Sequence, residues 1–191
     1  MSVVHLFDPP ERFVTGTVGE PGSRTFFLQA REGRRLVSVS LEKQQVALLA
    51  ERIDELLDEV TGAVPTIIPA MAPLGLVDNE PLEQPIEEEF RAGTMTLSWD
   101  VEDLRVVIEV YPFDDSLGDP AAAQEEDADG EGAEPEELLV VRLEAGPARA
   151  FAKRSLQVVG AGRETCPFCG GPIDADGHLC PRANGFRRRD P

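Results

Sequence analysis

Three cysteines and one histidine near the carboxyl-terminal end could together bind a metal ion. The cysteines are Cys166, Cys169 and Cys180, and His178 lies two residues before the last of them. Three thiolates and one imidazole make a complete tetrahedral ligand set for Zn²⁺. The two-residue gap in Cys166-x-x-Cys169 lets both sulfur atoms face one ion. Because a closed set leaves no position for a reacting water, the sequence predicts a structural zinc site.

This interpretation has alternatives. His178 and Cys180 form an i, i+2 pair, which is less common than a second two-residue gap, so Asp174, Asp176 or a residue of a partner chain could supply the fourth ligand. Without a metal, the cluster is three reduced thiols and a surface histidine in a flexible tail. A disulfide is disfavoured because the number of cysteines is odd. A redox centre is disfavoured because the residues around the Cys-x-x-Cys motif do not favour a helix start.

Charge and hydropathy exclude several classes of partner. The net charge of −18 disfavours binding to nucleic acid and to anionic membranes. Segment 114–137 holds eleven acidic residues and no basic one, so we expect a disordered acidic insertion there. No apolar run approaches the roughly 20 residues that span a bilayer, and the first ten residues do not resemble a signal peptide. We therefore expect a cytoplasmic protein, in which thiols stay reduced.

Hydrophobic periodicity predicts three strands and a helix in each half of the chain. In the first half, the strands are 12–18, 24–31 and 35–41, and the helix has an apolar stripe formed by Val46, Leu49, Ile53, Leu56 and Val60. In the second half, the strands are 90–100, 104–111 and 138–144. A helix then begins at Pro147, with a buried face formed by Ala148, Phe151, Ala152, Ser155, Leu156 and Val159.

The two halves match at an offset of 102 residues, which pairs Leu36 with Leu138 and Leu41 with Leu143. We therefore predict an α+β fold of two pseudo-symmetric β-β-β-α repeats with a zinc-knuckle-like tail. The predicted parts are residues 1–62 and 90–162 for the repeats, 63–89 for a Gly/Pro-rich connector packed on the core, and 163–191 for the zinc-binding tail.

Other polar motifs are weaker candidates. Gly16, Gly19 and Gly22 have the spacing of a phosphate-binding loop, but a strand follows them where such loops need a helix, so a hairpin turn is the better interpretation. Arg12 and Arg24 flank this hairpin as possible anion contacts. The acids at 100–103 have no nucleophile or histidine nearby in the sequence, which disfavours catalysis.

The chain resembles an uncharacterised actinobacterial family of conserved hypothetical "repeat proteins", the domain of unknown function 3090. The resemblance rests on residues 13–19, 24–30, 41–57, 93–95 and 166–185. The family has no established activity, and its members are similar to one part of a trio of uncharacterised proteins. The resemblance therefore implies a role in binding a protein partner.

These observations favour a non-enzymatic binding or adaptor module in which zinc orders a tail that docks a protein partner. One alternative is an enzyme or sensor that binds a phosphorylated or nucleotide small molecule near Arg12 and Arg24. Another is RNA binding through the zinc tail, where Arg182 and residues 187–189 are basic. The sequence identifies no catalytic residue and no small-molecule ligand.

Overall fold

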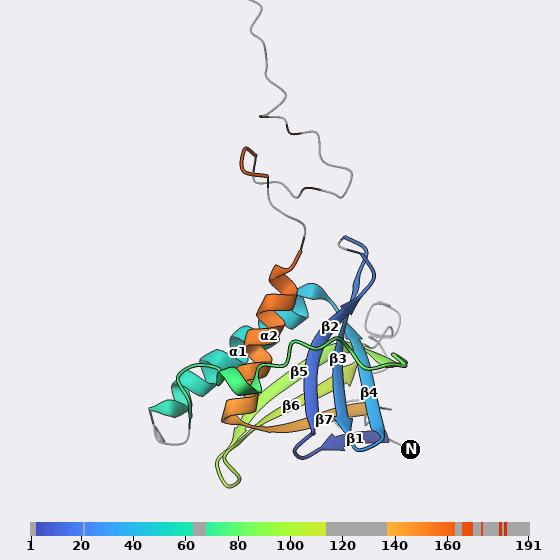
Figure 1. Cartoon of the computed structure of the whole chain (residues 1–191). Helices are drawn as coiled ribbons and strands as arrows, with labels where there is room; N and C mark the ends of the chain where they lie inside the picture. Colours follow the sequence, from blue (N-terminus) through green and yellow to red (C-terminus); the bar gives the residue numbers. More distant parts are fainter. Residues whose placement is uncertain are drawn as a thin grey trace, which may run out of the picture.

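In the described part of the chain, seven strands form one mixed β-sheet, and two α-helices pack beside it and against each other (Figure 1). The computed structural model describes residues 3–20, 22–62, 68–113, 137–162, 166–169, 173, 180 and 182. The strands are β1 (Val3–Phe7), β2 (Arg12–Val18), β3 (Thr25–Glu32), β4 (Arg35–Leu41), β5 (Glu88–Asp100), β6 (Arg105–Pro112) and β7 (Glu137–Glu144). The helices are α1 (Lys43–Thr61), the short 3₁₀ helix η1 (Leu74–Leu76) and α2 (Ala145–Gly160).

The strand order in the sheet is β1-β7-β6-β5-β4-β3-β2. β4 pairs with β5, and β1 with β7, in parallel; every other neighbouring pair is antiparallel. The predicted α+β class is confirmed. Three strands followed by a helix occur twice, as β2-β3-β4-α1 and β5-β6-β7-α2, and both sets share one sheet. The pseudo-symmetry of the two sets stays a prediction.

The hairpins form where the sequence places turn residues. β2 and β4 have the predicted bounds, and β3 is shifted by one residue. Gly19 and Gly22, in the turn between β2 and β3, have φ angles of 100° and 105°. Residues that carry a Cβ atom rarely adopt such angles. This connection is a hairpin between antiparallel strands, as we expected from the strand that follows the glycines.

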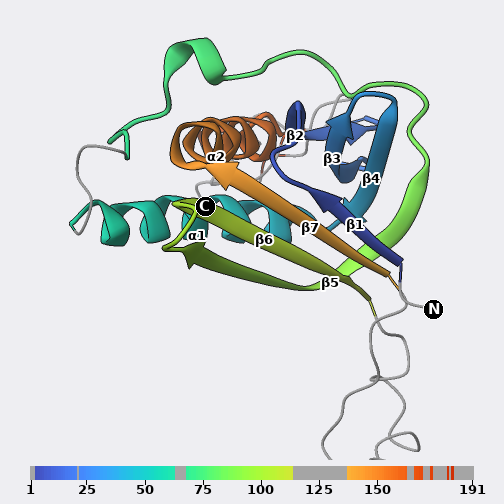
Figure 2. The same ribbon diagram turned by 90° about the horizontal axis from the view of Figure 1, so that it is seen from below.

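β1 is the strand that the sequence pattern did not predict. It runs parallel to β7, with Phe7 opposite Val141, and Phe7 is completely buried. Val4 and Leu6, on the other face of β1, are about half exposed. Figure 2 shows β1 beside β7 at the amino-terminal end of the chain. A five-residue strand whose partner lies more than 130 residues away gives no local signal.

α1 begins with a capping box, a pattern that satisfies free backbone N–H groups at a helix start. The side chain of Gln45 accepts from the backbone N–H of Glu42 at 2.8 Å, and the side chain of Glu42 accepts from the backbone N–H of Gln45. Gln45 also donates to the carbonyls of Ala92 and Gly93 on β5 at 3.2 and 2.9 Å. The cap therefore fixes the start of α1 against the central strand.

The buried face of α1 differs from the predicted stripe by one position. Val46, Leu49 and Ile53 are buried as expected, whereas Leu57 is completely buried and Leu56 only partly. Each fully buried aliphatic side chain stabilises the fold by about 2 kcal/mol. This face packs against the sheet and α2.

α2 begins at Ala145, two residues before the predicted start at Pro147. Phe151 stacks on Phe13 of β2, with ring centroids 4.4 Å apart. Ser155 and Thr15 form a buried hydrogen bond of 2.7 Å. Leu156 was expected on the buried face but is 37% exposed. Among the strands, α2 therefore packs mainly on β2, which is the opposite edge of the sheet from β1.

The connector covers the face of β2 and β3 that lies away from the main core. Leu82 packs there with Val14 and Phe27 in a second apolar cluster. The Gln29 side chain donates to the carbonyl of Glu83 at 3.0 Å and accepts from its N–H at 2.8 Å, as a neighbouring strand would. Both faces of β2 and β3 are consequently buried, which simple alternation along a strand did not predict.

Candidate metal centre

The Cys166-Pro167-Phe168-Cys169 segment forms a tight turn that brings the sulfur atoms of its two cysteines within 4.8 Å of each other. Proline favours such a turn because its ring fixes the φ angle. Cys166 is buried and Cys169 half-buried, whereas Phe168 at the tip is 61% exposed. The turn therefore shields its two cysteines from solvent to a large extent and leaves the ring of Phe168 exposed.

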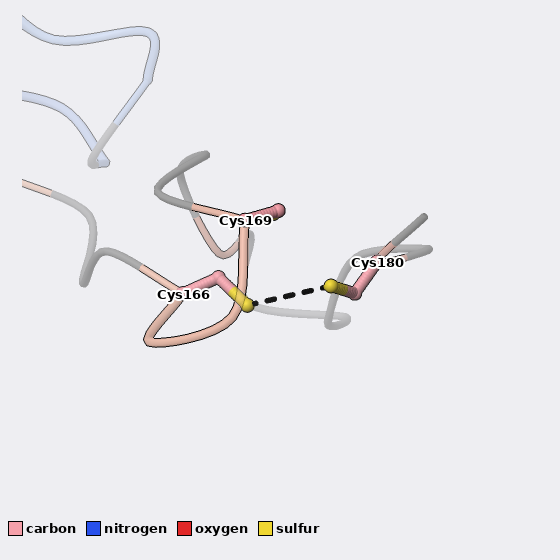
Figure 3. A group of neighbouring side chains, drawn as sticks. All are labelled: Cys166, Cys169 and Cys180. Carbon is pink, nitrogen blue, oxygen red and sulfur yellow. Dashed lines mark hydrogen bonds between the residues drawn. The ribbon is translucent and has the colours of Figure 1, made fainter. Parts of the chain in front are cut away.

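Cys180 completes a cluster of three thiols. It is buried, and its Sγ lies 3.7 Å from that of Cys166 (Figure 3). The sulfur atoms of Cys166, Cys169 and Cys180 all lie within 4.8 Å of one another. A disulfide has an S–S distance of about 2.05 Å, and none of the three cysteines is in a disulfide. A group of three close thiols could bind a metal ion.

The surroundings of Cys166 favour its thiolate. The backbone N–H of Cys169 donates to the Cys166 sulfur and lowers the pKa of this thiol; the N–H of Phe168 acts in the same direction, against the effect of burial. A thiol must lose its proton to become a metal ligand. Backbone N–H groups aimed at a sulfur also fix its orientation toward an ion.

The predicted ligand set is only partly within the described residues. The structure brings Cys166, Cys169 and Cys180 together. His178 and the alternative ligands Asp174 and Asp176 lie outside the described residues. His178 as the fourth ligand therefore stays a prediction. The acidic insertion and the basic residues 187–189 also lie outside, apart from Glu137 at the start of β7.

Arg12, a predicted anion contact, lies at the start of β2 with several acceptors around its guanidinium group. Its Nε donates to Oδ2 of Asp78 at 2.6 Å and its Nη2 to Oδ1 at 3.1 Å. Nη2 also donates to the carbonyls of Glu80 and Pro81. An anion at Arg12 would have to displace Asp78.

Arg24, the other predicted anion contact, caps the carboxyl end of α2. Its Nη1 donates to the carbonyl of Ala161 at 3.0 Å and its Nη2 to that of Val158 at 3.2 Å. Arg24 also lines a cavity of about 250 Å³ with Gly22, Phe26, Lys43 and Gly162. Two basic side chains therefore lie at this cavity, and the sequence indicated only one of them.

The sequence pattern missed a buried arginine that joins three elements. Arg154 of α2 donates to the carbonyl of Thr15 at 2.8 Å, to that of Glu80 at 2.7 Å and to the carboxylate of Asp78 at 3.1 Å. Burial lowers the pKa of Arg154, whereas the hydrogen bond to Asp78 raises that of Arg12. A basic residue on a predicted helix gives no sign that it is buried.

The acids after β5 have a structural role in their turn. Asp100 accepts from the backbone N–H groups of Glu102 and Asp103 at 2.9 and 3.1 Å and from Arg142 at 2.6 Å. These contacts, with the Asp103 N–H the strongest, lower the pKa of Asp100.

A second group of possible metal ligands was also missed. His5, Glu89 and Glu137 come from β1, β5 and β7, and one ligand atom of each lies within 4.8 Å of the others. These residues are far apart in the sequence and share no local spacing, so no sequence pattern connects His5 with the two glutamates.

Comparison with protein families places the chain in one of them. The family model described as "Protein of unknown function (DUF3090)" matches residues 5–180. The chain therefore belongs to this family, as the resemblance predicted. Searches of curated proteins and of solved structures each returned no significant match. Neither α1 nor α2, the long helices of the described ranges, has an apolar run that could cross a membrane.

Proposed function

We propose that Cys166, Cys169 and Cys180 bind one zinc ion, with His178 as the fourth ligand. The 3.7 Å separation between the Cys166 and Cys180 sulfur atoms carries this proposal. Two thiolates about 2.3 Å from a tetrahedral zinc ion lie about 3.8 Å apart. The thiols are therefore already spaced as the edge of such a tetrahedron.

The proposed zinc ion has a structural role. Three thiolates and an imidazole fill its coordination sphere, so no position is left for a substrate or a reacting water. Binding free energies of about 10–16 kcal/mol are typical of structural zinc in small peptides. A few residues around Cys166 and Cys180 cannot form a large apolar core, so the ion supplies the free energy that orders them.

The ordered tail serves as a protein-binding module. Phe168 is 61% exposed at the tip of the turn between two of the ligands. Aromatic anchors of this kind contribute strongly to protein interfaces. A metal-fixed turn presents the ring in one position, which lowers the entropy cost of binding a partner. The two predicted β-β-β-α repeats form the body that carries this module.

Affinity capture from the native organism tests this function. Three baits are compared: the full chain, a chain that ends at Thr165, and the Phe168→Ala variant. The full chain and Phe168→Ala, which both keep the tail, are used at equal zinc content. We expect one partner to be captured by the full chain and reduced at least about tenfold by Phe168→Ala, the loss of a hot-spot contact. Met71→Ala is the matched control, because Met71 is also exposed, at 80%, but lies in the connector. Undiminished capture by the truncated chain would contradict the proposal.

A small phosphorylated ligand is the second candidate function, favoured by the cavity at Arg24 and Lys43. Within the described ranges, Lys43 has no hydrogen bond or ion pair with the protein. Its Nζ lies close to Gly162, because a Cβ atom added to this glycine would be 3.7 Å from it. A thermal-shift screen with nucleotides and sugar phosphates tests this candidate. Stabilisation by one compound that Lys43→Gln abolishes would support it. Lys43→Gln is preferable to Arg24→Ala, because Arg24 also caps α2.

A further inference from the structure

The amino-terminal strand, the central strand β5 and β7 bring three metal-ligating side chains to one place. These are His5, Glu89 and Glu137, whose ligand atoms lie within 4.8 Å of one another. Figure 2 shows the first residues of β1 and β7 at the same end of the sheet. The site is separate from the cysteine cluster, which lies beyond the end of α2.

The register of β1 and β7 explains why His5 and Glu137 meet. Val3 lies opposite Glu137 and His5 opposite Leu139 in the parallel pair. Side chains at i and i+2 of a strand share one face, and so do paired residues of neighbouring strands. His5 therefore lies on the same face of β1 as the buried Phe7, and Glu137 lies on the matching face of β7.

The electrostatics of this site favour a bound cation. Among the described residues, no Lys or Arg forms an ion pair or hydrogen bond with Glu89 or Glu137. Elsewhere in the fold, carboxylates such as Asp78 and Asp8 pair with arginines. Two neighbouring carboxylates without a cation repel each other, and a positive ion between them removes this repulsion.

His5 supplies the second, independent observation. Its Nε2 is buried and has no hydrogen-bond partner within the described part of the chain. Buried polar atoms almost always have a partner, and an exception requires an explanation such as an ion. A metal ion bound between this imidazole and the two carboxylates would supply the missing partner.

We propose that His5, Glu89 and Glu137 bind a divalent first-row metal ion. One imidazole and two carboxylates suit Mn²⁺ or Zn²⁺, in contrast to the softer thiolate set of the tail. Ligand atoms about 2.1 Å from an ion lie at most about 4.2 Å apart. Glu89 is exposed and can change its rotamer to close the remaining distance. Three protein ligands leave further coordination positions for water.

The ion would join strands that are not neighbours in the sheet. β1 pairs with β7, but β6 lies between β7 and β5 in the order β1-β7-β6-β5. A ligand from each of these strands connects the first strand of the chain to the centre of the sheet. The expected consequence is that metal binding raises the thermal stability of the protein and reduces hydrogen exchange in β1.

Manganese is the probe that tests this site. Mn²⁺ prefers oxygen and nitrogen ligands to thiolates, so it leaves the zinc-loaded tail unchanged. Electron spin-echo measurements on full-length protein with Mn²⁺ detect ¹⁴N coupling from a bound imidazole. His5 and His178 are the two histidines of the chain. We expect ¹⁴N coupling in wild type and in His178→Ala, and none in His5→Ala.

Variants of the carboxylates complete the test. Glu137→Gln keeps the side-chain shape, and we expect it to weaken Mn²⁺ binding by more than about 10-fold, the lower limit of the loss that changes in outer-shell residues typically cause. Glu87→Gln is the matched control: it removes the same charge two residues before Glu89, outside the cluster. Thermal melts confirm that each variant is folded. Absence of ¹⁴N coupling in wild type, coupling that persists in His5→Ala, or equal effects of Glu137→Gln and Glu87→Gln would overturn the proposal.

Discussion

Gly16 of β2 lies directly beneath Leu82 of the connector. A Cβ atom added to Gly16 would lie 2.4 Å from Cγ of Leu82 and 2.6 Å from its Cδ2. Such a separation is far below a normal van der Waals contact, so the absence of a side chain at residue 16 lets the connector pack on the sheet. Gly16 was considered above as part of a phosphate-binding pattern, and the structure gives it a packing role instead.

Gly16→Ala should therefore destabilise the protein by about 1–3 kcal/mol, the usual cost of overpacking. Gly75→Ala is the matched control, because a Cβ at Gly75 would meet nothing within 4 Å. Urea denaturation of both variants measures the free energy of unfolding. Equal stability of the two variants would show that the connector can move away from β2 without cost.

Thr15 and Ser155 form a buried hydrogen bond between β2 and α2. Thr15→Val or Ser155→Ala alone leaves one buried hydroxyl without this partner, at a cost of about 1–3 kcal/mol. The double variant removes both hydroxyl groups, so its cost should be smaller than the sum of the two single costs. A double-mutant cycle by chemical denaturation measures the difference, and strictly additive costs would rule out coupling between the residues.

Asp78 should make stability depend on pH. The hydrogen bond from Arg12 lowers the folded-state pKa of Asp78, whereas the unfolded chain has the ordinary value of about 3.9. On acidification the unfolded state binds this proton first. The stabilisation from Asp78 is therefore present above about pH 3.9 and is lost as the pH falls toward the lower folded-state pKa.

The comparison of wild type with Asp78→Asn tests this dependence. The stability difference between the two proteins should be large near neutral pH and should shrink as the pH falls from about 5 to about 3. The other carboxylates titrate in both proteins, so they cancel in the difference. A difference that stays constant over this range would mean that Asp78 titrates alike in the folded and unfolded states.

Two neighbouring faces of α1 should respond differently to a charge. Ile53 is completely buried, whereas Leu48 is 54% exposed. Ile53→Asp places a carboxylate in the core and should cost more than about 4 kcal/mol, enough to unfold a marginally stable protein. Leu48→Asp should change stability by less than about 1 kcal/mol. Circular dichroism melts separate the two outcomes, and a folded Ile53→Asp protein would show that the helix face is wrongly assigned.

The sequence predicted the elements that local patterns determine. β2 and β4 have the predicted bounds because glycine-containing turns delimit them, and the helices follow their apolar stripes. The sequence did not predict β1, because its pairing partner β7 lies more than 130 residues later in the chain. It also did not predict that the connector around Leu82 buries the second face of β2 and β3.

The same distinction applies to the candidate sites. Cys166 and Cys169 are separated by two residues in a turn, so their spacing alone predicts convergence, and the structure places Cys180 beside them. His5, Glu89 and Glu137 converge only because the sheet brings β1, β5 and β7 together. Long-range convergence of this kind requires knowledge of the fold.

Cobalt substitution is the most direct test of the zinc site. Tetrahedral Co²⁺ bound by thiolates gives a sulfur-to-cobalt charge-transfer band, which carboxylate and imidazole ligands alone do not produce. We predict this band at one equivalent of Co²⁺ in wild type, its weakening in Cys166→Ser, and its displacement by one equivalent of Zn²⁺. Absence of the band in protein saturated with Co²⁺, or a band that Cys166→Ser leaves unchanged, would contradict the assignment of the three cysteines as metal ligands.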